Sequence, residues 1–146
     1  MHFFYILSSL YKRYLSLKIE NSDNFYLFES GIFYLFIDND AKFMSNILNL
    51  KLTNLNSQIV KCGFPTSHLD KYLKILKDMN YSNIQIVSSN SFLAYSQKDY
   101  FTNIKAKNLI KKIANVRSDN LSISQAFDFI EEITSEANLI VHEIDS

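Results

Sequence analysis

The chain has 146 residues and a formal net charge of zero, and 47% of its residues are hydrophobic, which is typical of one globular domain and not of a disordered chain. Its two glycines, Gly31 and Gly63, lie too far apart for the glycine-rich loops of P-loop or Rossmann nucleotide-binding proteins. A single cysteine, Cys62, excludes an internal disulfide and a multi-cysteine zinc site. We therefore expect no cofactor and no metal.

The N-terminal segment is apolar but short. It lacks the positively charged start of a signal peptide, and Lys12 and Arg13 interrupt it before the roughly 18 apolar residues that a membrane-spanning helix needs. We expect a cytoplasmic protein in a reducing compartment, with no membrane partner.

The N-terminal third predicts a helix, a hairpin and a second helix. Apolar residues at spacings of three and four predict a helix over about 3–19. Two apolar runs, 25–28 and 32–37, flank Gly31, whose freedom to adopt a positive φ suits a hairpin turn. Both runs are almost wholly apolar, so we expect a sheet covered on both faces. Asp38 is expected to cap the short helix that follows.

The middle of the chain predicts strands on both sides of a helix. Residues 52–60 are expected to form one or two strands, which the turn at 63–65 ends. Ser67 and Asp70 have the spacing of a capping box, and 84–87 has the pattern of a strand. The helix between them is expected to bury one apolar face, made of Leu69, Tyr72, Leu73, Leu76 and Met79.

The last part of the chain predicts two helices. One is expected over about 107–116, and Ser122 or Ser124 is expected to cap a second, longer helix. Residues 139–144 fit either a closing strand or a frayed tail. The inward-facing residues of the long helix are expected to be Ile123, Ala126, Phe127, Ile130 and Ile133. The order of elements predicts a single α/β (α+β) domain with a mixed β-sheet flanked by helices.

The zero net charge is the sum of two opposite segments. Residues 1–118 hold all 15 basic residues and eight of the 15 acidic ones, a net charge of +7, whereas residues 119–146 hold the other seven acids and no Lys or Arg. Such an asymmetry is typical of contact with nucleic acid combined with an acidic tail. A solvated C-terminal helix in which acids happen to cluster is the alternative interpretation.

The sequence nominates no catalytic constellation. His68 and Asp70 lie two positions apart at a helix start, where capping and solvation account for them. A nuclease would need acids clustered around a divalent cation, and Asp38 and Asp40 are the one close pair expected in a loop. We therefore expect a non-enzymatic protein.

Four segments of the chain, taken in order, are similar to motifs of one protein family. Residues 13–18, RYLSLK, are similar to an opening QYLxLK helix, and residues 31–41, GIFYLFIDNDA, to a GDFYELFxxDA segment at the same spacing. Residues 60–65, followed by residues 69–73, Leu76 and Tyr81, resemble a GxP and LDxYLxKLxxxGY element, and residues 84–87 stand in the place of a VAIxEQ strand. Together these segments resemble the N-terminal mismatch-recognition domain of the MutS family of DNA mismatch repair proteins.

The resemblance implies one DNA-contacting residue. In that family the phenylalanine of a Phe-x-Glu motif wedges into the minor groove and stacks on a mispaired base, which the glutamate then hydrogen-bonds. By position the phenylalanine is Phe33, but Leu35 occupies the glutamate position. The resemblance thus implies that Phe33 can insert into a base step, which costs least where base pairing is already poor. It also implies that the hydrogen bond from the glutamate to the base is missing. The residues themselves also allow Phe33 to be an ordinary core ring of its strand.

Resemblance and charge together imply a non-enzymatic module that binds mismatched or distorted double-stranded DNA. Phosphate contacts are expected from Lys71, Lys74, Lys77, Lys105, Lys107, Lys111 and Lys112. The alternative is a protein-interaction or regulatory module of the same fold, in which residues 119–146 engage a basic partner or fold over the chain's own basic face.

The resemblance also bears on domain organisation. Its motifs cover residues 13–87, and we expect residues 1–118 to form the MutS-like domain. Residues 119–146 are expected to form an acidic helix and tail packed on that same domain. The family joins this domain to clamp and ATPase domains, for which 146 residues leave no room. Any ATPase that works with this chain would then come from a separate protein partner.

Overall fold

The computed structural model describes residues 2–89 and 94–146 and, within them, every side chain except those of residues 2–8 and 118. The chain divides into two compact units, Met1–Gln97 and Lys98–Ser146, and each is described by itself. Within the described ranges, no helix is long and apolar enough to cross a membrane.

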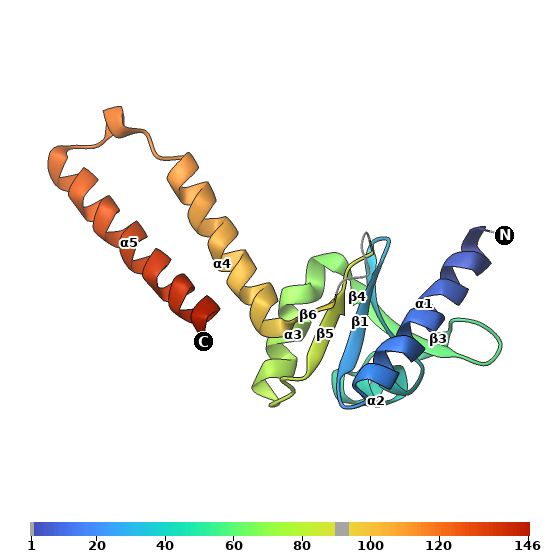
Figure 1. The fold of residues 1–146 in the computed structure, drawn as a ribbon. Coiled ribbons are helices and arrows are strands. Elements are labelled where there is room, and N and C mark those ends of the chain that lie inside the picture. Colours follow the sequence, from blue (N-terminus) through green and yellow to red (C-terminus); the bar gives the residue numbers. More distant parts are fainter. Residues whose placement is uncertain (1, 90–93) are drawn as a thin grey trace. The chain divides into compact units, whose positions relative to one another are not determined.

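The first unit is built on a six-stranded sheet with the strand order β3-β4-β2-β1-β5-β6 (Figure 1). β1 and β5 pair in parallel, and every other neighbouring pair is antiparallel. The predicted fold class, mixed α/β with a mixed sheet, is confirmed. The strands are β1 Phe25–Ser30, β2 Phe33–Ile37, β3 Thr53–Asn54, β4 Val60–Pro65, β5 Ile84–Val87 and β6 Ala94–Ser96.

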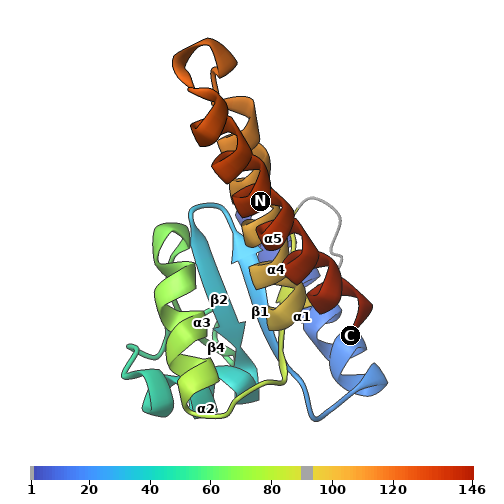
Figure 2. The ribbon, with the colours of Figure 1, turned by 90° about the vertical axis from the view of Figure 1, so that its left-hand side faces the viewer.

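Helices cover both faces of this sheet, as the apolar runs predicted. Figures 1 and 2 show α1 and α3 on opposite sides of the strands. On the α1 side, the ring of Tyr14 packs edge-on against Phe28 of β1. On the other side, the ring of Tyr72 in α3 stacks on Phe64 of β4. The helices of this unit are α1 His2–Glu20, α2 Asp38–Leu48 and α3 Leu69–Asp78, with a 3-10 turn, η1 Thr66–His68, before α3.

The second unit is a helical hairpin. α4 Gln97–Ala114 and α5 Ile123–Asp145 are joined through a 3-10 turn, η2 Ser118–Asn120. The hydroxyl of Ser122 accepts a hydrogen bond from the Gln125 amide, and the Gln125 side chain accepts one from the Ser122 amide. The predicted Ser122 cap is therefore confirmed as a capping box.

The division into compact units falls between Gln97 and Lys98, whereas the domain boundary expected from the sequence at residue 118 stays a prediction. The ion pairs of α4 with α5 join Lys105 to Glu143 and Lys112 to Glu132 and Glu136. α4 also begins well before the predicted residue 107.

Predictions at two helix starts are wrong. Ile37, not Asp38, is the N-cap residue of α2, and no side chain caps that helix. Asp38 instead has a φ of 55°. Ser67 and Asp70 form no capping box, because η1 separates the end of β4 from α3 and no side-chain hydrogen bond caps α3.

Several strand and burial predictions are also corrected. The segment 63–65 belongs to β4 and does not end a strand before it, and residues 139–144 are helical within α5. Three residues expected to face inward on α5 are exposed: Ile123, Phe127 and Ile130. Met79, expected on the buried face of α3, is exposed at its C-cap.

Candidate nucleic-acid interface

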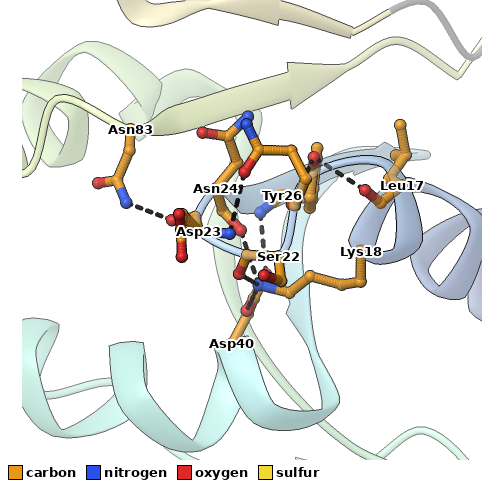
Figure 3. Close-up of polar contacts among 9 residues, drawn as sticks. Leu17, Lys18, Ser22, Asp23, Asn24, Tyr26, Asp40 and Asn83 are labelled. Carbon is orange, nitrogen blue, oxygen red and sulfur yellow. Dashed lines mark hydrogen bonds and ion pairs between the residues drawn. The ribbon is translucent and has the colours of Figure 1, made fainter.

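Two of the sequence motifs meet in a buried ion pair. Lys18, the last residue of RYLSLK, contacts the carboxylate of Asp40 in GIFYLFIDNDA at 2.7 Å. The lysine also donates hydrogen bonds to the carbonyls of Ser22 and Asn24, and the second oxygen of Asp40 accepts the amide of Tyr26 at 2.9 Å (Figure 3). This cluster ties α1 and the start of α2 to β1.

The Asp40 carboxylate is deeply buried, with 3% of its side chain exposed, and Lys18 is 21% exposed. Burial raises the pKa of Asp40, and the hydrogen bonds from Lys18 and the Tyr26 amide only partly offset it. The described contacts of the Asp40 carboxylate are thus with Lys18 and the Tyr26 amide, which gives this acid a structural role. Among the described residues, no cluster of three or more His, Cys, Asp or Glu is placed to hold a metal.

Phe33 stands at the start of β2, directly after the hairpin turn. Gly31 in that turn has a φ of 60°, a conformation that favours glycine. Phe33 pairs with Ser30 on one side and Pro65 on the other, and its side chain is 44% exposed. Of the two interpretations of Phe33, the structure contradicts the core ring: the ring lies at the surface.

Phe33 borders a groove of about 410 Å³ on the α1 side of the sheet. Leu35, two residues along the strand, lines the same groove, together with Gly63 across the β2–β4 ladder. A Cβ atom at Gly63 would collide with the carbonyl oxygen of Tyr34 and the side chain of Leu35. Glycine is therefore required by the close approach of β2 and β4. Leu35 is 9% exposed, so its position offers an apolar surface and no carboxylate.

Two lysines that the sequence did not single out lie at this groove. Lys51, exposed before β3, and Lys61, half-buried in β4, line it with Phe33. Thr53 of β3 pairs with Lys61, which in turn pairs with Ile37. Residues two apart on a strand share a face, so Lys61 lies on the same face as Phe33 and Leu35. The strand pairing that brings Lys61 here is non-local, and a single sequence does not reveal it.

The lysines predicted on α3 lie elsewhere. Lys71, Lys74 and Lys77 are exposed on α3, which packs on the face of the sheet opposite Phe33, against Phe64. The structure therefore does not bring these three lysines to the groove.

The lysines predicted to contact phosphate on α4 belong to the second unit. Two of them form ion pairs with glutamates of α5. Lys105 forms an ion pair with Glu143, and Lys112 bridges Glu132 and Glu136, the latter at 2.8 Å. These hydrogen-bonded carboxylates, Glu132 first, raise the pKa of Lys112. Lys107 and Lys111 are exposed on the same helix.

Other polar groups of the first unit have structural roles. The Glu29 carboxylate accepts hydrogen bonds from the hydroxyl and amide of Ser89 and from the hydroxyl of Tyr34, and the Ser89 hydroxyl is the main cause of its lowered pKa. Cys62 is buried, and burial raises the pKa of its thiol to about 12, so it is no nucleophile at neutral pH.

The fold and this site define a small mixed α/β domain with an exposed aromatic ring beside a lysine-flanked groove. The family model of MutS domain I matches residues 8–117, and the chain belongs to this family. It is 40% identical over 75 residues to the DNA mismatch repair protein MutS of Petrotoga mobilis and 34% identical over 80 residues to that of Rickettsia akari. These matches cover 51% and 52% of this chain and 9% of each relative.

Proposed function

We propose that this chain is a non-catalytic DNA-binding module that recognises mismatched or otherwise distorted duplex through Phe33. The observation that carries the proposal is the exposed ring of Phe33 at the rim of a groove lined by Lys51 and Lys61. A ring at that place is suited to enter a weakly stacked base step. The two ammonium groups are suited to neutralise the flanking phosphates.

Leu35 limits which features of the duplex such a module can recognise. A carboxylate beside the wedge would hydrogen-bond a base edge, whereas Leu35 presents only an apolar side chain to the groove. Recognition would then depend on how easily the duplex unstacks, and little on which bases are mispaired. We propose that looped and mismatched duplexes bind alike, and both more tightly than homoduplex.

Fluorescence anisotropy with homoduplex, mismatched and looped DNA at two salt concentrations tests the proposal. Phe33→Leu is expected to remove the preference for distorted duplex and to leave the weak, salt-dependent binding. Phe43→Leu is the matched control, because Phe43 of α2 is 42% exposed but its ring stacks on Phe25 of β1. Absence of salt-dependent binding to every duplex, or an equal loss in both variants, would refute the proposal.

The same titration assigns the phosphate contacts. Neutralising Lys51 or Lys61 to glutamine is expected to weaken binding to all duplexes and to reduce the salt slope by about one each. We propose smaller effects for Lys71, Lys74 and Lys77, because α3 lies on the other face of the sheet from Phe33. A larger effect from the α3 lysines would place the DNA on that face instead.

The ion pairs between α4 and α5 favour a second, regulatory role. α5 carboxylates occupy Lys105 and Lys112, two of the residues expected to contact phosphate, so α5 would compete with DNA for them. The double variant Glu132→Gln/Glu136→Gln frees Lys112 and is expected to raise DNA affinity, most at low salt. Asp128→Gln removes the same kind of charge from a residue outside these ion pairs and serves as the control. Unchanged affinity in the double variant would refute this role.

A further inference from the structure

α5 has two distinct apolar faces, and among the described side chains of the helical hairpin only one of them is partly buried. On the first, Phe129, Ile133 and Ile140 are half-buried, on the side from which Glu136 and Glu143 reach the lysines of α4. The second face includes three of the five residues that the sequence predicted to point inward, Ile123, Phe127 and Ile130, and the structure leaves these three exposed. We call it the α5 seam, and its residues are Ile123, Phe127, Ile130, Thr134, Ala137, Val141 and Ile144.

The α5 seam has the spacing of a coiled coil. Its residues alternate at intervals of four and three along the whole helix, which is the repeat that keeps one stripe facing a partner helix. The five large side chains of the seam are between 53% and 80% exposed. Single exposed hydrophobic residues are ordinary, but a continuous stripe of this kind marks an interaction site.

We infer that the α5 seam binds the α5 seam of a second copy of this chain in antiparallel orientation. The seam residues occupy alternately the a and the d positions of a heptad repeat. In an antiparallel coiled coil, each a residue of one helix packs against a d residue of the other. One register brings Phe127 against Ile144 of the second copy, Ile130 against Val141, and Thr134 against Ala137. Each layer occurs twice by symmetry, with the small pairs nearest the two-fold axis, where they allow close approach of the helices.

The charges beside the α5 seam select this orientation and register. On one side of the seam the flanking residues are Ser124, Glu131, Asn138 and Asp145. In the proposed register Glu131 lies opposite Asn138 of the second copy, and Asp145 lies opposite Ser124, so each acid meets a hydrogen-bond donor. A shift by one heptad would instead place Glu131 opposite Glu131. A parallel pair would press Glu131 against Ala126.

The acidic character of α5 does not oppose this association. Glu132, Glu136 and Glu143 form ion pairs with Lys105 and Lys112 of α4 within each copy, so two of these three negative charges are compensated away from the seam. The other flank of the seam is wholly apolar, with Ala126 and the half-buried Ile133 and Ile140. The second copy therefore meets an apolar stripe with one apolar edge and one polar, hydrogen-bonding edge.

Sedimentation velocity of the full chain across the micromolar range tests the inference. The wild-type chain is expected to change from monomer to dimer as its concentration rises. Ile130→Glu is expected to remain monomeric, because it buries a charge at the seam. Leu139→Glu is the matched control: Leu139 is 65% exposed on the same helix but lies off the seam, so this variant is expected to dimerise like wild type. Far-UV circular dichroism confirms that both variants fold.

Two changes at Asn138 test orientation and register. Asn138→Lys would face Glu131 of the second copy twice per dimer and is expected to lower the dimer Kd about fivefold at low salt. Asn138→Asp is expected to raise the Kd by a similar factor, whereas Ser135→Asp, which adds the same charge on the outer surface of α5, is expected to leave it unchanged.

Three results would overturn the inference. The first is a wild-type chain that stays monomeric at every concentration. A monomeric chain whose seam binds a basic helical peptide would count as the same result. The second is a dimer that survives Ile130→Glu. The third is a dimer whose Kd moves in the same direction, or not at all, in Asn138→Lys and Asn138→Asp. None of these readouts involves DNA, so the outcome is independent of the proposed function.

Discussion

Replacement of Lys18 by methionine tests the buried ion pair that joins the two family motifs. The substitution keeps most of the apolar stem and removes the ammonium group. Asp40, with 3% of its side chain exposed, would keep the amide of Tyr26 and the hydroxyl of Tyr14 as donors but no cation. Removing one partner of a buried pair costs about 3–5 kcal/mol, because the other charge stays buried and uncompensated.

Such a loss is a large share of the stability of a small domain, which is about 5–15 kcal/mol. Urea unfolding followed by circular dichroism measures it. Lys12→Met is the matched control, since Lys12 is an exposed lysine of the same helix and its loss is expected to cost less than about 0.5 kcal/mol. In the double variant Lys18→Met/Asp40→Asn the buried charge is gone, so part of the stability should return.

The pH dependence supplies a second, independent readout. The folded-state pKa of Asp40 is raised above its ordinary value by burial, so the folded protein binds this proton more tightly than the unfolded chain. Stability from this group is therefore greatest at low pH and falls as pH rises through the folded pKa. Without Lys18 the pKa rises further, so the deficit of Lys18→Met should be smaller in acid than at neutral pH. A deficit no larger than that of Lys12→Met, or one that grows as the pH falls, would refute the reasoning.

Three further variants test other parts of the structure in the same unfolding assay. Gly63→Ala is expected to cost about 1–3 kcal/mol, because its Cβ would collide with the Tyr34 carbonyl; an unchanged midpoint would contradict the close approach of β2 and β4. Ser122→Ala is expected to cost about 1 kcal/mol by removing the α5 cap, and Ser122→Asp, which can still cap, should cost much less. Phe33→Leu is expected to change the free energy of unfolding by less than about 0.5 kcal/mol, because the Phe33 ring is exposed. A larger loss would indicate that the Phe33 ring packs in the core.

The local pattern of the sequence was sufficient for most elements of the first unit. The continuous apolar runs gave β1, β2 and β5, and the spacing of Leu69, Leu73 and Leu76 gave α3, because burial on a face imposes these periods directly. β6 lacked such a signal, as it is a three-residue edge strand, Ala94–Ser96. Its existence depends on pairing with β5, which is a non-local interaction.

The C-terminal helices show a different limit of sequence reasoning. The run 139–144 is apolar enough for a strand, and period alone does not separate a short strand from a helix segment. In the structure this run is helical within α5, and Glu136 and Glu143 beside it form ion pairs with Lys112 and Lys105 of α4. These contacts between two helices are non-local, so the local pattern that placed Phe127 on the inward face does not contain them.

The candidate site was predicted only in part for a similar reason. Phe33 was found because a short motif carries it, and its exposure follows from its place at the first residue of β2. Lys51 and Lys61 join it through the pairing of β3, β4 and β2, whose register a single sequence does not specify. The lysines on α3 were conspicuous in the sequence because they are evenly spaced. Such a spacing on an exposed helix indicates the solvent-facing side of the helix and does not by itself indicate a binding site.

The structure separates the motif residues that build the fold from the one that would act on DNA. Lys18 and Asp40 form the ion pair beneath β1, and Gly63 lets β4 approach β2, so folding alone accounts for all three. Phe33 differs, because its ring is 44% exposed at a strand end and lies outside the buried core. The motif residues Lys18, Asp40 and Gly63 thus have structural roles in this chain, whereas the proposed DNA recognition would depend on Phe33 and the lysines beside it. A variant that loses DNA preference at Phe33 while unfolding like wild type would separate the two roles within a single chain.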